Sequence, residues 1–111
     1  MRSNIDTIAN TARVDQVEYH PEFSTICSVG KRPFWGTIDI RFRPGQYLLE
    51  FESFDTWLAT LANESMVIED VARRAFDVLS EALGDIPLRV AVHARTTVHA
   101  PASAIIERGD T

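Results

Sequence analysis

The stretch Thr37-Ile38-Asp39-Ile40-Arg41-Phe42-Arg43 alternates strictly between polar and apolar residues. Its three apolar side chains, Ile38, Ile40 and Phe42, fall on one face, and the charged side chains fall on the other. An alternation of period two is typical of a β-strand that buries one face and exposes the other. The stretch therefore predicts a strand whose apolar face lies on the hydrophobic core.

A turn signal follows this strand directly. Proline presets a turn dihedral and glycine accepts positive φ, so Pro44-Gly45 favours a reversal of the chain. Tyr47, Leu49 and Phe51 then resume the alternation. The sequence predicts a β-hairpin over this region.

The hydrophobic period changes to that of a helix at Ser53, which is a suitable N-cap. This first predicted helix ends near Asn63, and its apolar residues are Phe54, Trp57, Leu58 and Leu61. Ser65 caps a second predicted helix, which Gly84 ends. The apolar stripe of the second helix comprises Ile68, Val71, Ala72, Ala75, Phe76, Leu79, Ala82 and Leu83.

Weaker alternation predicts the remaining strands, over Val14–His20, from Leu88 through Val98, and around 104–106. We expect an α+β fold in the order ββααββ, with a four-stranded antiparallel sheet and two helices on one face. A small open sheet leaves unpaired edges. Pairing these edges with neighbouring subunits into a closed barrel is one solution, which predicts a homo-oligomer.

The composition describes one globular domain. The chain has 111 residues, 45% hydrophobic and 24% charged. We expect a single domain over 13–106, a flexible N-terminal arm over 1–12 and a flexible tail over 107–111. With 11 Lys and Arg against 16 Asp and Glu, the net charge is −5, so nucleic acid is not the expected partner. Neither a leader nor an apolar run of membrane-spanning length is present, which predicts a cytoplasmic protein without a membrane partner.

Cys27 is the single cysteine, so no internal disulfide can form. A lone cysteine is either a small buried hydrophobe or a nucleophile. Cys27 closes the phrase Pro21-Glu22-Phe23-Ser24-Thr25-Ile26-Cys27, Glu50 follows it by 23 positions, and Glu69 follows it by 42. With Pro33, Thr37-Ile38, Ser53 and Asp70, this register resembles the 7-cyano-7-deazaguanine (nitrile) reductases of the tunnelling fold, which act in queuosine biosynthesis.

The resemblance implies a catalytic role for Cys27. In that family the cysteine thiolate attacks a nitrile carbon to give a thioimide, which NADPH reduces. Glu69 matches the carboxylate that grips the guanine-like edge of the substrate, and Glu50 matches the glutamate of the nicotinamide-binding motif. The family also implies a homo-oligomer, as a pentamer or as two stacked pentamers that form a decamer.

This sequence departs from the family pattern at positions that serve reduction. Phe34 replaces the aspartate that protonates the nitrile nitrogen. Ile68 replaces the histidine before the gripping glutamate, so a second polar group of the substrate pocket becomes apolar. Glu52 and Asp55 replace the two lysines of the nicotinamide-binding motif, so repulsion replaces attraction toward phosphate groups. Thr97-Val98-His99 stands near the place of the family's later Arg-Gly-Gly.

We therefore expect an enzyme that binds a guanine-like or other small heterocycle through Glu69. Cys27 would form a thioimide or thioester, without NADPH or another cofactor. Phe34 and Trp35 either line an apolar slot for a different electrophile or pack in the core. The alternatives are a genuine NADPH-dependent nitrile reductase, an amidine-forming relative that acts on tRNA, and a non-catalytic heterocycle-binding or scaffolding relative.

A metal site is not expected. The zinc-dependent cyclohydrolases of this fold need a cysteine and two histidines around one ion. On a regular strand His93 and His99 would share a face about 20 Å apart, at about 3.3 Å per residue, which is too far for one ion. The Gly-x-Ser-x-Gly signature of a serine hydrolase is also absent from the sequence.

Overall fold

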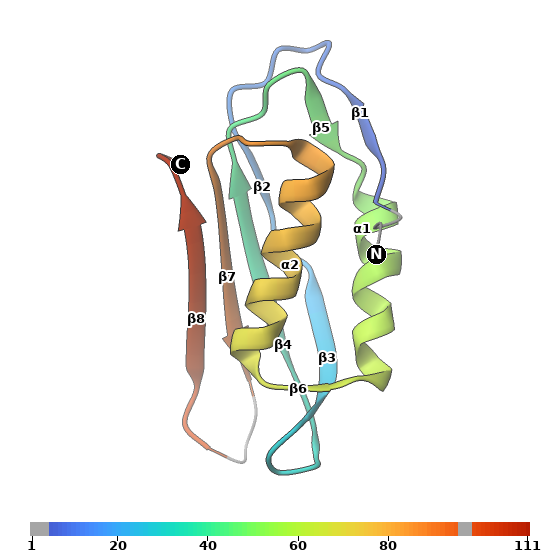
Figure 1. Cartoon of the computed structure of the whole chain (residues 1–111), viewed down its shortest axis with the longest axis vertical. Helices are drawn as coiled ribbons and strands as arrows, with labels where there is room; N and C mark the ends of the chain where they lie inside the picture. Colours follow the sequence, from blue (N-terminus) through green and yellow to red (C-terminus); the bar gives the residue numbers. More distant parts are fainter. Residues whose placement is uncertain (1–4, 96–98) are drawn as a thin grey trace.

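The computed structural model describes residues 5–95 and 99–111. Its elements follow one another as β1 (Thr7–Ala9), β2 (Val17–Tyr19), β3 (Glu22–Cys27), β4 (Pro33–Phe42), β5 (Tyr47–Leu49), α1 (Phe51–Ala59), β6 (Ser65–Met66), α2 (Ile68–Leu83), β7 (Leu88–Ala94) and β8 (Ala102–Arg108). A short 3-10 helix, Thr60–Asn63, continues α1. Figure 1 shows both α-helices on the same face of the main sheet.

The main sheet has six strands. Five of them follow one another in the order β6-β3-β4-β7-β8, and the sixth, β2, pairs with the C-terminal part of β4, next to the part that pairs with β3. Its pairings are antiparallel except for β3 with β6, which is parallel. β1 and β5 form a separate two-stranded antiparallel sheet. The predicted α+β class, with two helices on one face, is confirmed, although the main sheet has more strands than the four expected.

β4 supplies the centre of the core, as its alternation predicts. Ile38, Ile40 and Phe42 have no exposed surface. On β7, Leu88, Val90 and Val92 are buried in the same way and continue the apolar face. The helix α2 covers this face with its predicted stripe, in which Val71, Ala72, Ala75 and Leu79 have no exposed surface. Gly84, with φ of 87°, ends the helix in a conformation that favours glycine.

Gly36 allows β4 and β7 to approach closely. A Cβ atom at this position would lie 1.9 Å from the carbonyl oxygen of His93, whereas van der Waals contact needs more than 3 Å. The adjacent pairing also holds the strands together, because the Arg95 N–H donates to the Trp35 carbonyl over 2.7 Å. Only glycine fits this crossing without displacing the backbone.

The predicted hairpin after β4 is wrong. β5 pairs with β1 instead, and helix α1 already begins at Phe51. Asn10 directs this arrangement, because its side-chain amide donates to the carbonyl oxygens of Gly45 and Val14, at 3.0 and 3.2 Å. The turn at Pro44-Gly45 therefore leads the chain to the N-terminal segment rather than back along β4.

The two ends of the chain are also more regular than expected. Within the predicted arm over 1–12, Ile5 is buried and Thr7–Ala9 forms β1. At the other end β8 continues to Arg108, beyond the expected start of the tail at 107. Arg108 is held by Ser80 Oγ at 2.9 Å and by the Ile86 carbonyl. These contacts hold the C-terminal end of β8, which runs from Ala102 to Arg108 and is longer than the predicted 104–106.

Several element boundaries differ from the predictions. The predicted strand over Val14–His20 shortens to β2, and β3 was not predicted as a strand. Glu50, rather than Ser53, caps α1, and Ser65 lies in β6 rather than at the N-cap of α2. β7 ends at Ala94, and the part of its expected extension at 96–98 lies outside the described residues. None of the described helices is long and apolar enough to cross a membrane.

Candidate active site

Cys27 is the last residue of β3, at the start of the turn that leads into β4. The turn is closed by backbone hydrogen bonds on both sides of the cysteine. The Cys27 N–H donates to the Arg32 carbonyl over 2.8 Å, and the Lys31 N–H donates to the Cys27 carbonyl over 2.9 Å. Lys31 has φ of 59°, so the chain turns through a left-handed residue here. The half-buried cysteine therefore has a fixed backbone.

The turn points backbone N–H groups at the sulfur. The Gly30 N–H donates to Cys27 Sγ over 3.4 Å. This hydrogen bond is the largest cause that holds the pKa of the Cys27 thiol below its ordinary value; the Val29 N–H and the charge of Lys31 act in the same direction, and burial acts against them. The main activating groups are thus backbone amides, which have no sequence signature.

Cys27 lies in the wall of a cavity of about 360 Å³. The turn after β3, the start of β4 and the N-terminal end of α2 surround it, and Figure 1 shows these parts at one end of the sheet. The lining residues are Cys27, Val29, Gly30, Arg32, Pro33, Phe34, Val67, Ile68, Glu69, His99 and Ala102. The structure thus brings four of the predicted site residues together, namely Cys27, Phe34, Ile68 and Glu69.

Glu69 lies in the first turn of α2 and is exposed. Its neighbour Asp70 is the residue that caps the helix, because the Asp70 carboxylate accepts from the Val67 N–H over 3.2 Å. Within 5–95 and 99–111, the Glu69 carboxylate has no hydrogen bond or ion pair with another residue. Both of its oxygens are therefore available to accept from a ligand in the cavity.

Phe34 and Trp35 have different surroundings, because consecutive strand residues point to opposite faces. Phe34 is buried and packs edge-to-face on Phe23, with ring centroids 5.9 Å apart, so it serves both the core and the cavity wall. Trp35 is 51% exposed and lines a different hollow of about 580 Å³, together with Tyr19 and Asp55. Only Phe34 is available to the Cys27 cavity.

Glu50 is also not among the residues that line the Cys27 cavity. Its Oε2 accepts from the Glu52 N–H over 2.8 Å, and its Oε1 accepts from the Ser53 N–H over 2.9 Å. Both carboxylate oxygens are used to cap α1. The structure thus gives Glu50 a helix-capping role within this chain.

Asp55 has a structural partner as well. Its two carboxylate oxygens accept from the Tyr19 hydroxyl, each at 2.7 Å. Burial of the phenol, followed by this hydrogen bond and the negative charges of Asp55 and Glu50, raises the pKa of Tyr19 to about 12. The Tyr19 ring also stacks on Phe51, with centroids 4.1 Å apart. With Glu50 and Glu52, Asp55 places three carboxylates in the region that resembles the nicotinamide-binding motif.

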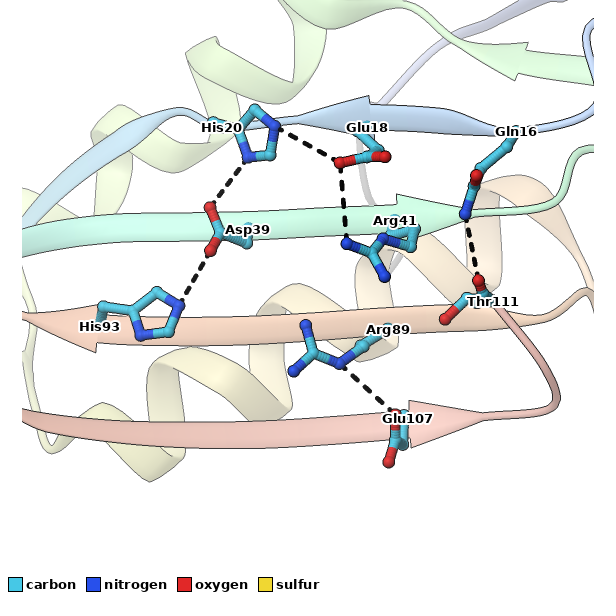
Figure 2. A network of polar contacts seen from close by, with 9 residues as sticks. All are labelled: Gln16, Glu18, His20, Asp39, Arg41, Arg89, His93, Glu107 and Thr111. Carbon is cyan, nitrogen blue, oxygen red and sulfur yellow. Dashed lines mark hydrogen bonds and ion pairs between the residues drawn. The ribbon is translucent and has the colours of Figure 1, made fainter.

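A polar network that sequence reasoning missed covers the sheet face opposite the helices. Figure 2 shows Asp39 between two histidines, with His20 Nδ1 and His93 Nε2 each 2.9 Å from its carboxylate oxygens. His93 Nδ1 also lies 2.6 Å from Ser103 Oγ. Burial raises the pKa of Asp39, but the hydrogen bonds from the two histidines outweigh it and hold the pKa below its ordinary range. This network links β2, β4, β7 and β8.

His20 and His93 both contact Asp39, whereas His99 lines the Cys27 cavity, so the three histidines do not share one site. In the described part of the chain, no group of three or more His, Cys, Asp or Glu residues is placed to hold a metal ion.

Comparison with solved structures supports the class of this fold. The crystal structure of the archaeosine synthase QueF-Like in the apo form superimposes with a TM-score of 0.81, over 88% of this chain and 97% of that chain, at 14% sequence identity. At this identity the likeness defines the fold alone. The protein is thus an α+β protein of the tunnelling fold, with a cysteine and a glutamate in one cavity.

Comparison with curated proteins gives the family. The chain is 34% identical over 89 residues to the NADPH-dependent 7-cyano-7-deazaguanine reductase of Frankia casuarinae, over 80% of this chain and 68% of that protein. It is 31% identical over 85 residues to the reductase of that name from Anaeromyxobacter sp. strain K, and 30% identical over 79 residues to that of Rhodopirellula baltica. These two alignments cover 69% and 68% of this chain, and 70% and 65% of the relatives.

The chain belongs to the 7-cyano-7-deazaguanine reductase family, as a divergent member. No family model matches it. The predicted resemblance is therefore confirmed, and membership of a family of enzymes supports the expectation of an enzyme.

Proposed function

We propose that this protein binds a guanine-like or other small heterocycle through Glu69 and attacks it with Cys27. The product would be a covalent thioimide or thioester, formed without reduction by NADPH. The observation that carries the proposal is that Cys27 and Glu69 line one cavity of about 360 Å³ in a chain of this family. A cavity of this size lies within the range of about 300–1,000 Å³ that is usual for small-molecule sites.

The state of the sulfur supports the role of Cys27. A thiolate, rather than a thiol, is the nucleophile. The Gly30 N–H donates to Sγ, and this contact lowers the pKa of the thiol. The half-buried sulfur combines access to a ligand with stabilisation of its charged form.

The surroundings of Glu69 support its role in ligand binding. A carboxylate can accept two parallel hydrogen bonds from a ring N–H and an exocyclic amine, as on the edge of guanine. Asp70 already caps the helix, so this local task does not require Glu69. Phe34 and Ile68 give the cavity apolar walls against which a flat ring can pack.

The charges on α1 argue against a phosphate-bearing cofactor. Glu52 and Asp55 are both exposed and carry negative charge where the family motif has two lysines, and Glu50 matches the glutamate of the motif. Like charges disfavour the approach of the phosphates of NADPH. We therefore propose that the reaction either ends at the covalent adduct or continues when water or an amine attacks the adduct and releases Cys27.

Intact-mass spectrometry after incubation with 7-cyano-7-deazaguanine tests this proposal. We expect an adduct with the mass of one ligand, which is absent from a Cys27→Ala protein. Tight reversible binding without an adduct would instead favour a non-catalytic heterocycle-binding or scaffolding protein.

A second candidate is a genuine NADPH-dependent nitrile reductase, because the relatives are named NADPH-dependent. Absorbance of NADPH in the same mixture separates the two candidates. Saturable consumption of NADPH would support the reductase and would contradict the cofactor-free reaction.

We further propose that the protein works in the cytoplasm as a homo-oligomer, as a pentamer or a decamer. β8 lies at the edge of the main sheet, and its outward-facing Ile105 is 49% exposed. An exposed edge strand is a template for pairing with another chain. Light scattering that finds a monodisperse monomer would contradict this assembly.

A further inference from the structure

Addition of a thiol to a nitrile requires a proton on the nitrile nitrogen as the S–C bond forms. In this cavity Phe34 and Ile68 are hydrocarbon walls and hold no exchangeable proton. Either the reaction obtains this proton from water, or another side chain of the cavity supplies it.

His99 is placed to handle this proton. It lines the same cavity as Cys27 and Glu69, and reaches it from the segment that leads into β8. Its side chain is exposed. Imidazole groups change charge between about pH 5 and 8, so they exchange protons under ordinary conditions.

The hydrogen bond of His99 determines which ring nitrogen is free. Nδ1 lies 2.6 Å from the carbonyl oxygen of Ala100. A carbonyl oxygen can only accept, so Nδ1 carries the hydrogen. The neutral ring then presents an unprotonated Nε2, which can take up a proton and release it again.

The other ionisable groups of the cavity are less suited to this task. Besides Cys27 and His99, the described lining residues include two, Arg32 and Glu69. An arginine does not give up its proton in proteins, and Glu69 is assigned to holding the ligand. Lys31, whose positive charge helps to lower the pKa of the Cys27 thiol, is not among the lining residues.

We propose that His99 is the catalytic proton carrier of the Cys27 addition, an assignment that rests on the proposed function. Nε2 accepts the proton of the Cys27 thiol, Sγ forms a bond to the nitrile carbon, and one π bond of the nitrile breaks. The imidazolium then returns the proton to the nitrogen, which gives R–C(=NH)–S–Cys27. Thiol and nitrile account for all atoms of this thioimide, and no oxidant or reductant is consumed.

The rate of adduct formation with 7-cyano-7-deazaguanine, followed by intact mass between pH 5 and 9, tests this assignment. We expect His99→Gln and His99→Ala to lower the rate by about 100-fold or more, as for loss of a general acid or base. Added imidazole should restore part of the rate of His99→Ala. The matched control is His20→Gln, which removes a histidine outside the Cys27 cavity and should leave the rate unchanged.

Alkylation by iodoacetamide at pH 9 separates chemistry from structure, because alkylation needs the thiolate but no proton on the electrophile. We expect this rate to be the same in His99→Gln and in the unmodified protein. A parallel fall of both rates, or an adduct rate that does not depend on His99, would overturn the role of His99 and leave the proposed function standing. An unmodified protein that forms no adduct would overturn the proposed function as well.

Discussion

The backbone N–H of Gly30 donates a hydrogen bond to Sγ of Cys27 over 3.4 Å. Three positions separate the two residues, and the turn after β3 brings them together. A donor at the sulfur stabilises the thiolate relative to the thiol, so this contact links the conformation of the turn to the reactivity of the cysteine.

Removal of this donor should slow the reaction of Cys27 near neutral pH. Since the pKa of the thiol is lowered in the folded protein, the thiolate fraction at pH 7 exceeds that of an unperturbed cysteine, and it falls as the pKa rises. Gly30→Pro deletes the N–H, so we expect the midpoint of the pH profile of iodoacetamide alkylation to move to higher pH. The matched control is Gly30→Ala, which keeps the N–H and places a methyl group 3.9 Å from Sγ. Identical profiles for the two variants would contradict the role of the hydrogen bond.

Glu69 should determine the affinity for the ligand. In a Cys27→Ala background, which cannot form the adduct, we expect Glu69→Gln to weaken binding of 7-cyano-7-deazaguanine by about 10- to 100-fold. This corresponds to about 1.5–3 kcal/mol for hydrogen bonds to a charged group. Isothermal titration calorimetry measures this change.

Asp70→Asn is the control for Glu69→Gln, since it removes one negative charge from the same helical turn. Asp70 caps α2, so this variant should lower stability and leave the affinity unchanged. Equal losses of affinity in the two variants would indicate a general effect of charge rather than a grip by Glu69.

Burial of the Tyr19 phenol and its hydrogen bond to Asp55 should make stability fall in alkaline solution. The pKa of Tyr19 is raised to about 12 in the folded protein, above its ordinary value of 10.0. The contribution is therefore complete below pH 10 and is lost as the pH rises from about 10 to about 12. Tyr19→Phe should cost about 1 kcal/mol of unfolding free energy at pH 7, the usual value for one hydrogen bond. Urea denaturation at pH 7 and pH 11 should show a smaller alkaline loss in Tyr19→Phe, and an equal loss would contradict this account.

Gly36 should be intolerant of any side chain. A Cβ atom there would lie 1.9 Å from the His93 carbonyl, so Gly36→Ala must separate β4 from β7. We expect a loss of about 1–3 kcal/mol, as for overpacking of a core, measured by thermal or urea unfolding. Gly45→Ala is the matched control, because apart from its immediate chain neighbours no heavy atom lies within 4 Å of the added methyl group. A loss in Gly45→Ala as large as that in Gly36→Ala would show that the close approach is not the cause.

A strand can be predicted from its sequence where its buried side chains are apolar and alternate with polar ones. The strict alternation around Ile38 and Ile40 predicted β4 because both side chains are apolar and both are fully buried. β3 was missed because its inward-facing Thr25 is polar, although it is 1% exposed, and its hydroxyl is satisfied by the Glu64 carbonyl at 2.8 Å. A polar residue in the core conceals the period on which such predictions depend.

The sequence also could not predict which strands pair or where backbone N–H groups point, because both depend on how distant or turning segments are placed in space. The alternation at Tyr47 indicated a strand but not its partner, β1, which lies far away along the chain. The resemblance placed Cys27 and Glu69 in one site, and both line one cavity. The opposite surroundings of Phe34 and Trp35 could have been predicted, because adjacent strand residues point to opposite faces. The Gly30 N–H and the position of His99 depend on the turns, which only the structure supplies.

The central claim is that Cys27 attacks a heterocyclic ligand held in its cavity, and that no NADPH is consumed. The most direct measurement is the intact mass of the protein after incubation with 7-cyano-7-deazaguanine, with and without NADPH, compared with that of the Cys27→Ala variant. The account predicts an increase equal to one ligand in the unmodified protein, unchanged by NADPH and absent from the variant. An unmodified mass under all conditions, or steady consumption of NADPH with turnover of the ligand, would contradict it.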